Sequence, residues 1–143
     1  MIKKILTAVD NSARAPSVLA AAVEIGEKFD ASVLLFRVIA IPQEFPAAGA
    51  NEPDSMMAAL EQRARDELVA LAQGQARTTI LPLEVFAGQP WRAIVLAAEQ
   101  NEVDLIVIGS HGYSGWDRIL GTTASKVSDH ADRNVLVVHP RRP

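Results

Sequence analysis

The chain has 143 residues, of which 49% are hydrophobic and 22% are charged, and its formal net charge is −3. A chain of this length can bury one sizeable core, so we expect one globular domain over residues 1–143, and the near-average composition excludes a disordered or fibrous protein. The slightly acidic balance provides no basic face that could neutralise nucleic-acid phosphates, so we expect no nucleic-acid partner.

The cysteine count and the first residues predict a location. The sequence has no cysteine, which excludes disulfides and thiolate metal sites and fits a reducing compartment. Two lysines are followed by only a five-residue, largely apolar run before Asp10. That run is too short for a signal-peptide core or a membrane span. We therefore expect a cytoplasmic protein with no membrane partner.

The first half of the chain predicts a strand, a helix, a second strand and a second helix. Continuous apolar runs at 5–9 and 33–39 are typical of strands covered on both faces, as in parallel sheets. Residues 15–29 and 54–74 repeat apolar residues at helical spacing, and Asn11 or Ser12 is available as N-cap of the first helix. Residues 39–54 contain three prolines and predict a loop. The apolar positions of the helices are Val18, Ala22, Ile25 and Phe29, then Met57, Leu60, Ala64, Leu68 and Leu71.

The second half continues the alternation. Residues 78–86 predict a strand at a sheet edge, because Pro82 cannot donate to the ladder. A helix over 88–101 with Pro90 in its first turn, a strand at 104–108, a helix over 122–131 and a strand at 135–138 follow. This order predicts an α/β fold: an open, parallel, five-stranded sheet with helices on both faces. We expect the strand order 3-2-1-4-5.

The connection between the fourth strand and the last helix is rich in glycine. Four of the 8 glycines lie there, at positions 109, 112, 115 and 121. Ligands of open parallel sheets bind outside the carboxyl ends of the strands, glycines let backbone N–H groups approach an anion, and a helix N-terminus adds unsatisfied donors. A phosphate-shaped anion could be held between Gly109–Gly112 and Gly121–Thr123. The alternative is a loop whose glycines only turn the chain.

Other patterns limit the chemistry. A Walker A loop would need Lys after its last glycine, and a receiver-type phospho-acceptor domain would need an Asp after the third strand, where this chain has "EVFAG". Asp10, at the end of the first strand, fits a helix cap and a ligand contact equally well. An efficient ATP hydrolase would need a positioned base and metal carboxylates, and only Asp10 and Asp117 are near. We predict no metal site, no catalytic residue and at most slow hydrolysis.

Three segments carry a resemblance to a known family. "KKILTAVDNS" resembles the opening strand and acidic turn of universal stress proteins, "VLLFRVI" their second strand, and "DLIVIGSHGYSGWDRILGTTASKVSDHADRNVLVVHP" their nucleotide-binding signature and final strand. The ATP-binding branch spaces its last two signature glycines by nine residues, whereas eight separate Gly112 from Gly121 here. The resemblance implies a Rossmann-like fold of the adenine nucleotide alpha hydrolase type, and ATP, with or without Mg²⁺, as ligand.

The resemblance also implies site residues and a partner. Asp10, with Ala8 and Val9, would border the adenosine, and the backbone of Val38 and Ile39 would meet the adenine. The residues that would hold ribose and phosphates are Gly109, Gly112, Gly121, Thr122 and Thr123. The apolar run 135–138 would form an outermost strand with unpaired backbone groups, and the family commonly dimerises through this strand, so we expect a homodimer. Two hypotheses remain: an ATP-binding regulatory module of the stress response, or a dimeric interaction protein that does not retain nucleotide.

Overall fold

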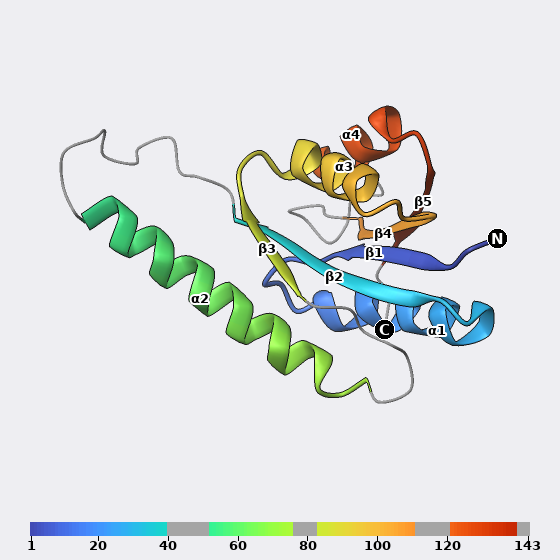
Figure 1. The fold of residues 1–143 in the computed structure, drawn as a ribbon, viewed down its shortest axis with the longest axis horizontal. Coiled ribbons are helices and arrows are strands. Elements are labelled where there is room, and N and C mark those ends of the chain that lie inside the picture. The colour runs from blue at the N-terminus through green and yellow to red at the C-terminus, as the bar shows by residue number, and fades with distance from the viewer. Residues whose placement is uncertain (40–51, 76–82, 111–120, 140–143) are drawn as a thin grey trace.

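The computed structural model describes residues 1–39, 52–75, 83–110 and 121–139, in which strands and helices alternate along the chain (Figure 1). The strands are β1 (Lys4–Ala8), β2 (Ser32–Ile39), β3 (Glu84–Ala87), β4 (Leu105–Gly109) and β5 (Asn134–Val138). The helices are α1 (Ala15–Phe29), α2 (Glu52–Ala72), α3 (Pro90–Gln100) and α4 (Thr122–His130). The alternation expected from the sequence is confirmed.

The five strands form one parallel sheet in the order β3-β2-β1-β4-β5, as predicted. β1 is the central strand, and its last residue, Ala8, lies opposite Phe36 of β2 and Ile108 of β4. The chain winds in one direction from β1 to β2 and β3, and in the other from β4 to β5. Ligands of such sheets bind where the winding reverses, which here is the carboxyl end of β1 and β4.

Helices cover both faces of the sheet, with α1 and α2 on one face and α3 and α4 on the other (Figure 1). Alternate residues of a strand point to opposite faces, so Ile5 of β1 and Val9, directly after it, point towards α1, while Leu6 and Ala8 point towards α3 and α4. Because both faces are buried, the inner strands need apolar residues at nearly every position. The continuous apolar runs of the sequence follow from this arrangement.

The start of α1 differs from the sequence prediction. Asn11 and Ser12 were the expected N-caps, but the helix begins at Ala15 with Arg14 at the cap position and no side-chain cap hydrogen bond. Pro16 lies in the first turn, where its missing N–H needs no partner. The helical face was also expected to bury Phe29, which is 48% exposed. This is the last helical residue, and the left-handed Asp30 that follows turns the chain away into β2.

The second helix and the third strand refine two predicted boundaries. α2 begins at Glu52, so the end of the predicted 39–54 loop is helical, while 40–51 lie outside the described residues. The expected inward face of α2 is confirmed by the burial of Ala64 and Leu68. β3 lies at a sheet edge, as expected, although Pro82 lies outside the described residues. Within the described ranges, no helix is long and apolar enough to cross a membrane.

Candidate functional site

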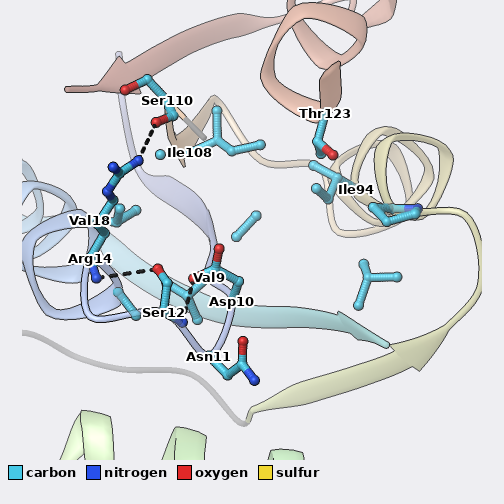
Figure 2. Close-up of a pocket in the computed structure, with 15 residues that line it drawn as sticks. Val9, Asp10, Asn11, Ser12, Arg14, Val18, Ile94, Ile108, Ser110 and Thr123 are labelled. Atoms are coloured by element: carbon cyan, nitrogen blue, oxygen red, sulfur yellow. Dashed lines mark hydrogen bonds between the residues drawn. The ribbon is translucent and has the colours of Figure 1, made fainter. Parts of the chain in front are cut away.

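A cleft of about 400 Å³ opens at the carboxyl ends of β1 and β4 (Figure 2). Its volume lies within the range of roughly 300–1,000 Å³ that is typical of small-molecule sites. Aliphatic side chains from the sheet, α1 and α3 form one part of the lining, namely Ala8, Val9, Val18, Val38, Ile94 and Ile108. Polar groups form the other part, namely Asp10, Asn11, Ser12, Arg14, Ser110 and Thr123. Such a mixture suits a ligand with a flat apolar part and a polar or charged part.

Asp10 shapes the turn that connects β1 to α1. Its Oδ1 accepts a hydrogen bond from the backbone N–H of Ser12 at 2.9 Å, and the Oγ of Ser12 accepts one from the N–H of Arg14 at 3.3 Å. These are the local side-chain-to-backbone bonds by which Asp and Ser fix turns. The carboxylate therefore stabilises the turn itself and does not cap α1, which begins five residues after Asp10, at Ala15.

The N-terminus of α1 adjoins the cleft, but its backbone donors are already used. The N–H of Arg14 donates to Ser12, the N–H of Ala15 donates to the carbonyl of Ser12 at 3.2 Å, and Pro16 has no N–H. The next two donors, of Ser17 and Val18, both reach the carbonyl of Arg14, at 3.0 and 3.2 Å. The backbone of α1 therefore offers no free donor to an anion.

The N-terminus of α4 is different, because none of its first backbone donors is bonded to a described residue. The first helical hydrogen bond runs from Ser125 to the carbonyl of Gly121 at 2.9 Å, and the cap residue Gly121 makes no side-chain cap bond. No described residue accepts a hydrogen bond from the N–H groups of Thr122, Thr123 or Ala124. Thr123 lines the cleft. The cleft thus has one helix N-terminus whose donors and positive dipole end can act on an anion.

Gly109 and Gly121 lie at the two ends of the glycine-rich connection between β4 and α4. A Cβ on Gly109 would lie 3.1 Å from Cγ2 of Val18, so the close packing of β4 against α1 explains a glycine there without any ligand. Gly121 has φ −59°, which any residue can adopt, so its backbone conformation does not require glycine. Gly112 lies outside the described residues, as do His111 and Asp117.

The end of β2 brings only one of its two predicted residues to the cleft. Val38 is part of the lining, whereas Ile39 is not. The carbonyl of Ile39 instead accepts a hydrogen bond from the N–H of Gly88 at 3.0 Å, which ties β2 to the residue after β3. Of the other predicted site residues, Ala8, Val9, Asp10, Gly109 and Thr123 line the cleft, while Gly121 and Thr122 adjoin Thr123 at the start of α4.

A comparison with protein families decides the assignment. The model described as the universal stress protein family matches residues 1–139. The chain belongs to this family. Universal stress protein A homolog 1 of Coxiella burnetii is 30% identical over 144 residues, which cover 95% of this chain and 95% of that protein.

Solved structures of other universal stress proteins have the same fold. UspA from Lactobacillus plantarum superposes with a TM-score of 0.77 at 29% identity, covering 96% of this chain and 97% of that one. A universal stress protein from Archaeoglobus fulgidus, solved in complex with dAMP, superposes with a TM-score of 0.60, covering 96% and 98% of the two chains. The latter is 22% identical, and at that level the likeness shows the fold alone.

In this universal stress protein, the sequence interpretation overlooked two polar residues of the cleft. Among the described residues that line it, Arg14 is the only cation, and its Nη1 donates to the carbonyl of Ser110 at 3.3 Å. The N–H of Ser110 donates to the carbonyl of Val138 at 2.9 Å. An arginine just before a helix resembles a solvated surface residue, and its partner is 96 positions away. No local pattern in the sequence indicates this contact.

The described residues include no metal centre. Across 1–39, 52–75, 83–110 and 121–139, no group of three or more His, Asp or Glu side chains is placed to hold a metal ion. The described histidine of α4, His130, has its Nδ1 at 2.8 Å from the carbonyl of Lys126 and stacks on Trp91, with ring centroids 4.4 Å apart. Its role is therefore in the contact between α3 and α4.

Proposed function

We propose that this universal stress protein binds an adenine nucleotide, ATP, in the cleft and acts as a regulatory module of the cytoplasmic stress response. The observation that carries the proposal is the open N-terminus of α4 beside the cleft, where the N–H groups of Thr122, Thr123 and Ala124 have no acceptor among the described residues. Backbone donors at a helix N-terminus are a common protein site for phosphate. The Archaeoglobus relative, solved in complex with dAMP, supports the choice of an adenine nucleotide.

The two parts of the cleft lining suggest how the nucleotide would lie. The adenine and ribose would contact the aliphatic part, with Ala8, Val9 and Asp10 beside the adenosine and the backbone of Val38 beside the base. The phosphates would lie towards α4, held by Gly109, Gly112, Gly121, Thr122 and Thr123. Asp10 supplies the one carboxylate among the described lining residues, so it is the side chain that could hold a Mg²⁺ ion bound together with the nucleotide.

A valine at the start of α4 tests this proposal. In the Gly121→Val variant the backbone conformation at φ −59° is allowed, and we expect the branched side chain to compete with an anion for the space in front of the helix donors. We expect ATP affinity, measured by calorimetry with and without Mg²⁺, to fall more than tenfold while the fold is retained. The matched control is Gly74→Val, because a Cβ at Gly74 would meet nothing within 4 Å. Equal ATP affinity of wild type and the Gly121→Val variant would contradict the proposal.

The second candidate function, a dimeric interaction protein, is favoured by the edge strand β5. Among the described strands, β5 pairs with β4 alone, and Leu136 is 37% exposed. The carbonyl of Val138 accepts a hydrogen bond from the N–H of Ser110, after β4. The backbone groups of successive residues in a strand point to opposite sides, so those of Val137 point to the open edge. A second copy could pair with this edge around a two-fold axis and satisfy those groups. We therefore propose a homodimer through β5, which is compatible with nucleotide binding in the cleft.

Analysis of the purified protein separates the two candidates. Mass spectrometry of small molecules released from gently purified wild-type protein would identify ATP or another adenine nucleotide under the first candidate. Protein that releases no nucleotide, binds none in calorimetry and still forms a dimer would instead support the interaction protein.

A further inference from the structure

We propose that Arg14 determines the specificity of the cleft, by contacting a phosphate group of the ligand so that nucleotides bind better than nucleosides. The assignment rests on the proposed function, and it adds a residue that lies outside the glycine-rich connection. Three observations support it: the position of the side chain, the state of its charge and the backbone donors around it.

Hydrogen bonds hold both the backbone and the guanidinium group of Arg14 in place. Its backbone N–H donates to the Oγ of Ser12, and its guanidinium Nη1 donates to the carbonyl of Ser110. Figure 2 shows the side chain extending from the start of α1 to the end of β4. Ser110 is 7% exposed and its N–H is bonded to Val138, so the acceptor is held firmly. The guanidinium is thereby placed directly after Gly109, at the carboxyl edge where ligands of such sheets bind.

The positive charge of Arg14 is not neutralised within the described residues. The ion pairs there are made by Lys28, Arg37, Arg63 and Arg133, and none includes Arg14. Its acceptor, the Ser110 carbonyl, is neutral and uses one of the five N–H donors of the guanidinium. As far as the described residues go, the remaining donors and the charge are therefore left to serve an anion in the cleft.

The backbone around the cleft explains why a side chain is needed on this side. The backbone N–H groups at the start of α1 all donate to Ser12 or to the carbonyl of Arg14. At this helix end, the group left to contact an anion is therefore the Arg14 side chain. On the other side, α4 supplies backbone donors next to Thr123. A phosphate chain between the two helices would meet a guanidinium from one and N–H groups from the other. Guanidinium groups bind phosphate with paired, charge-assisted hydrogen bonds.

The test compares ligands that share the adenosine part and differ in phosphate. Calorimetric titrations with adenosine, AMP and ATP are made on wild type, Arg14→Gln and Arg14→Lys, at low and at high salt. The matched control is Arg65→Gln, which removes one positive charge from an exposed position of α2. In the Arg14→Gln variant we expect ATP affinity to fall about tenfold or more, and adenosine affinity to change less than twofold. Arg14→Lys should recover part of the loss, and Arg65→Gln should leave all affinities unchanged.

Any other result of these titrations would contradict either the role assigned to Arg14 or the proposed function. Equal losses for ATP and adenosine in the Arg14→Gln variant would mean that Arg14 only holds the Ser110 carbonyl, and unchanged ATP affinity would mean that it does not contact phosphate. Either result overturns the assignment and leaves the proposed function in place, provided that wild type binds ATP. Wild-type protein that binds none of the three ligands would overturn the proposed function and the assignment together.

Discussion

Replacing Thr7 by valine should make the protein more stable. Thr7 is at the middle of β1, paired with Leu35 on one side and Val107 on the other, and it is 0% exposed. Its Oγ1 has no hydrogen-bond partner among the residues that the structure describes. A buried hydroxyl without a partner costs about 1–3 kcal/mol in proteins, and the methyl group that replaces it adds about 0.8 kcal/mol of favourable burial. Since the two side chains have nearly the same shape, we expect the free energy of unfolding to rise by about 2 kcal/mol.

Thermal and urea unfolding measure this effect. For a domain of this size, 1 kcal/mol shifts the melting temperature by about 3 °C, so the Thr7→Val variant should melt about 6 °C above wild type. The control is Thr7→Ser, which keeps the unpaired hydroxyl and removes a buried methyl group, and should lower stability by about 1 kcal/mol. A Thr7→Val variant that is no more stable than wild type would refute the reasoning, because it would mean that the buried hydroxyl carries no penalty in the folded state.

Two further predictions concern the sheet. Val137→Pro removes a donor from the open edge of β5 and should shift the dimer towards monomer in light scattering; a wild-type monomer at micromolar concentration, or an unchanged dimer in the variant, would contradict the β5 interface. Hydrogen bonds from the backbone N–H of Lys3 and of Lys4 hold the pKa of Asp104 below its ordinary value of 3.8. This stabilisation is present above pH 3.8 and is lost as the pH falls through the lower folded-state pKa. Asp104→Asn should therefore lower stability by about 1–2 kcal/mol at neutral pH, and the difference from wild type should shrink in acid. A difference that is constant with pH would contradict this account.

The sequence predicted the fold well where one local pattern determines one element. The strands β1, β2 and β4 could be predicted because neighbours such as Ile5 and Leu6 are both fully buried, on opposite faces of the sheet, which favours a continuous apolar run. The edge position of the third strand, expected from Pro82, is confirmed, although Pro82 itself lies outside the described residues. The carboxyl edge of β1 and β4 was likewise expected from the order of elements, and it is where the cleft lies.

The sequence was less informative where a feature depends on residues that are distant along the chain. The contact of Arg14 with Ser110 and the contact of Gly109 with Val18 both join α1 to the end of β4, and neither leaves a periodic signal. The cap of α1 was mispredicted because Asn11 and Ser12 are good cap residues by type, while the chain uses Ser12 to shape the preceding turn. Local preference decides which turn forms, but tertiary packing decides where the helix begins.

The distribution of the cleft lining has a practical consequence for labelling the molecule. Among the described residues, the lining comes from β1, α1, β2, α3, β4 and α4 and the turns beside them, and none comes from α2 or β3. α2 packs against β2 and β3, which lie at the other end of the strand order from β5. Because the sequence contains no cysteine, one cysteine introduced at an exposed position of α2 would be the sole thiol of the chain. A fluorophore attached there would report on tumbling and assembly without touching either the cleft or β5.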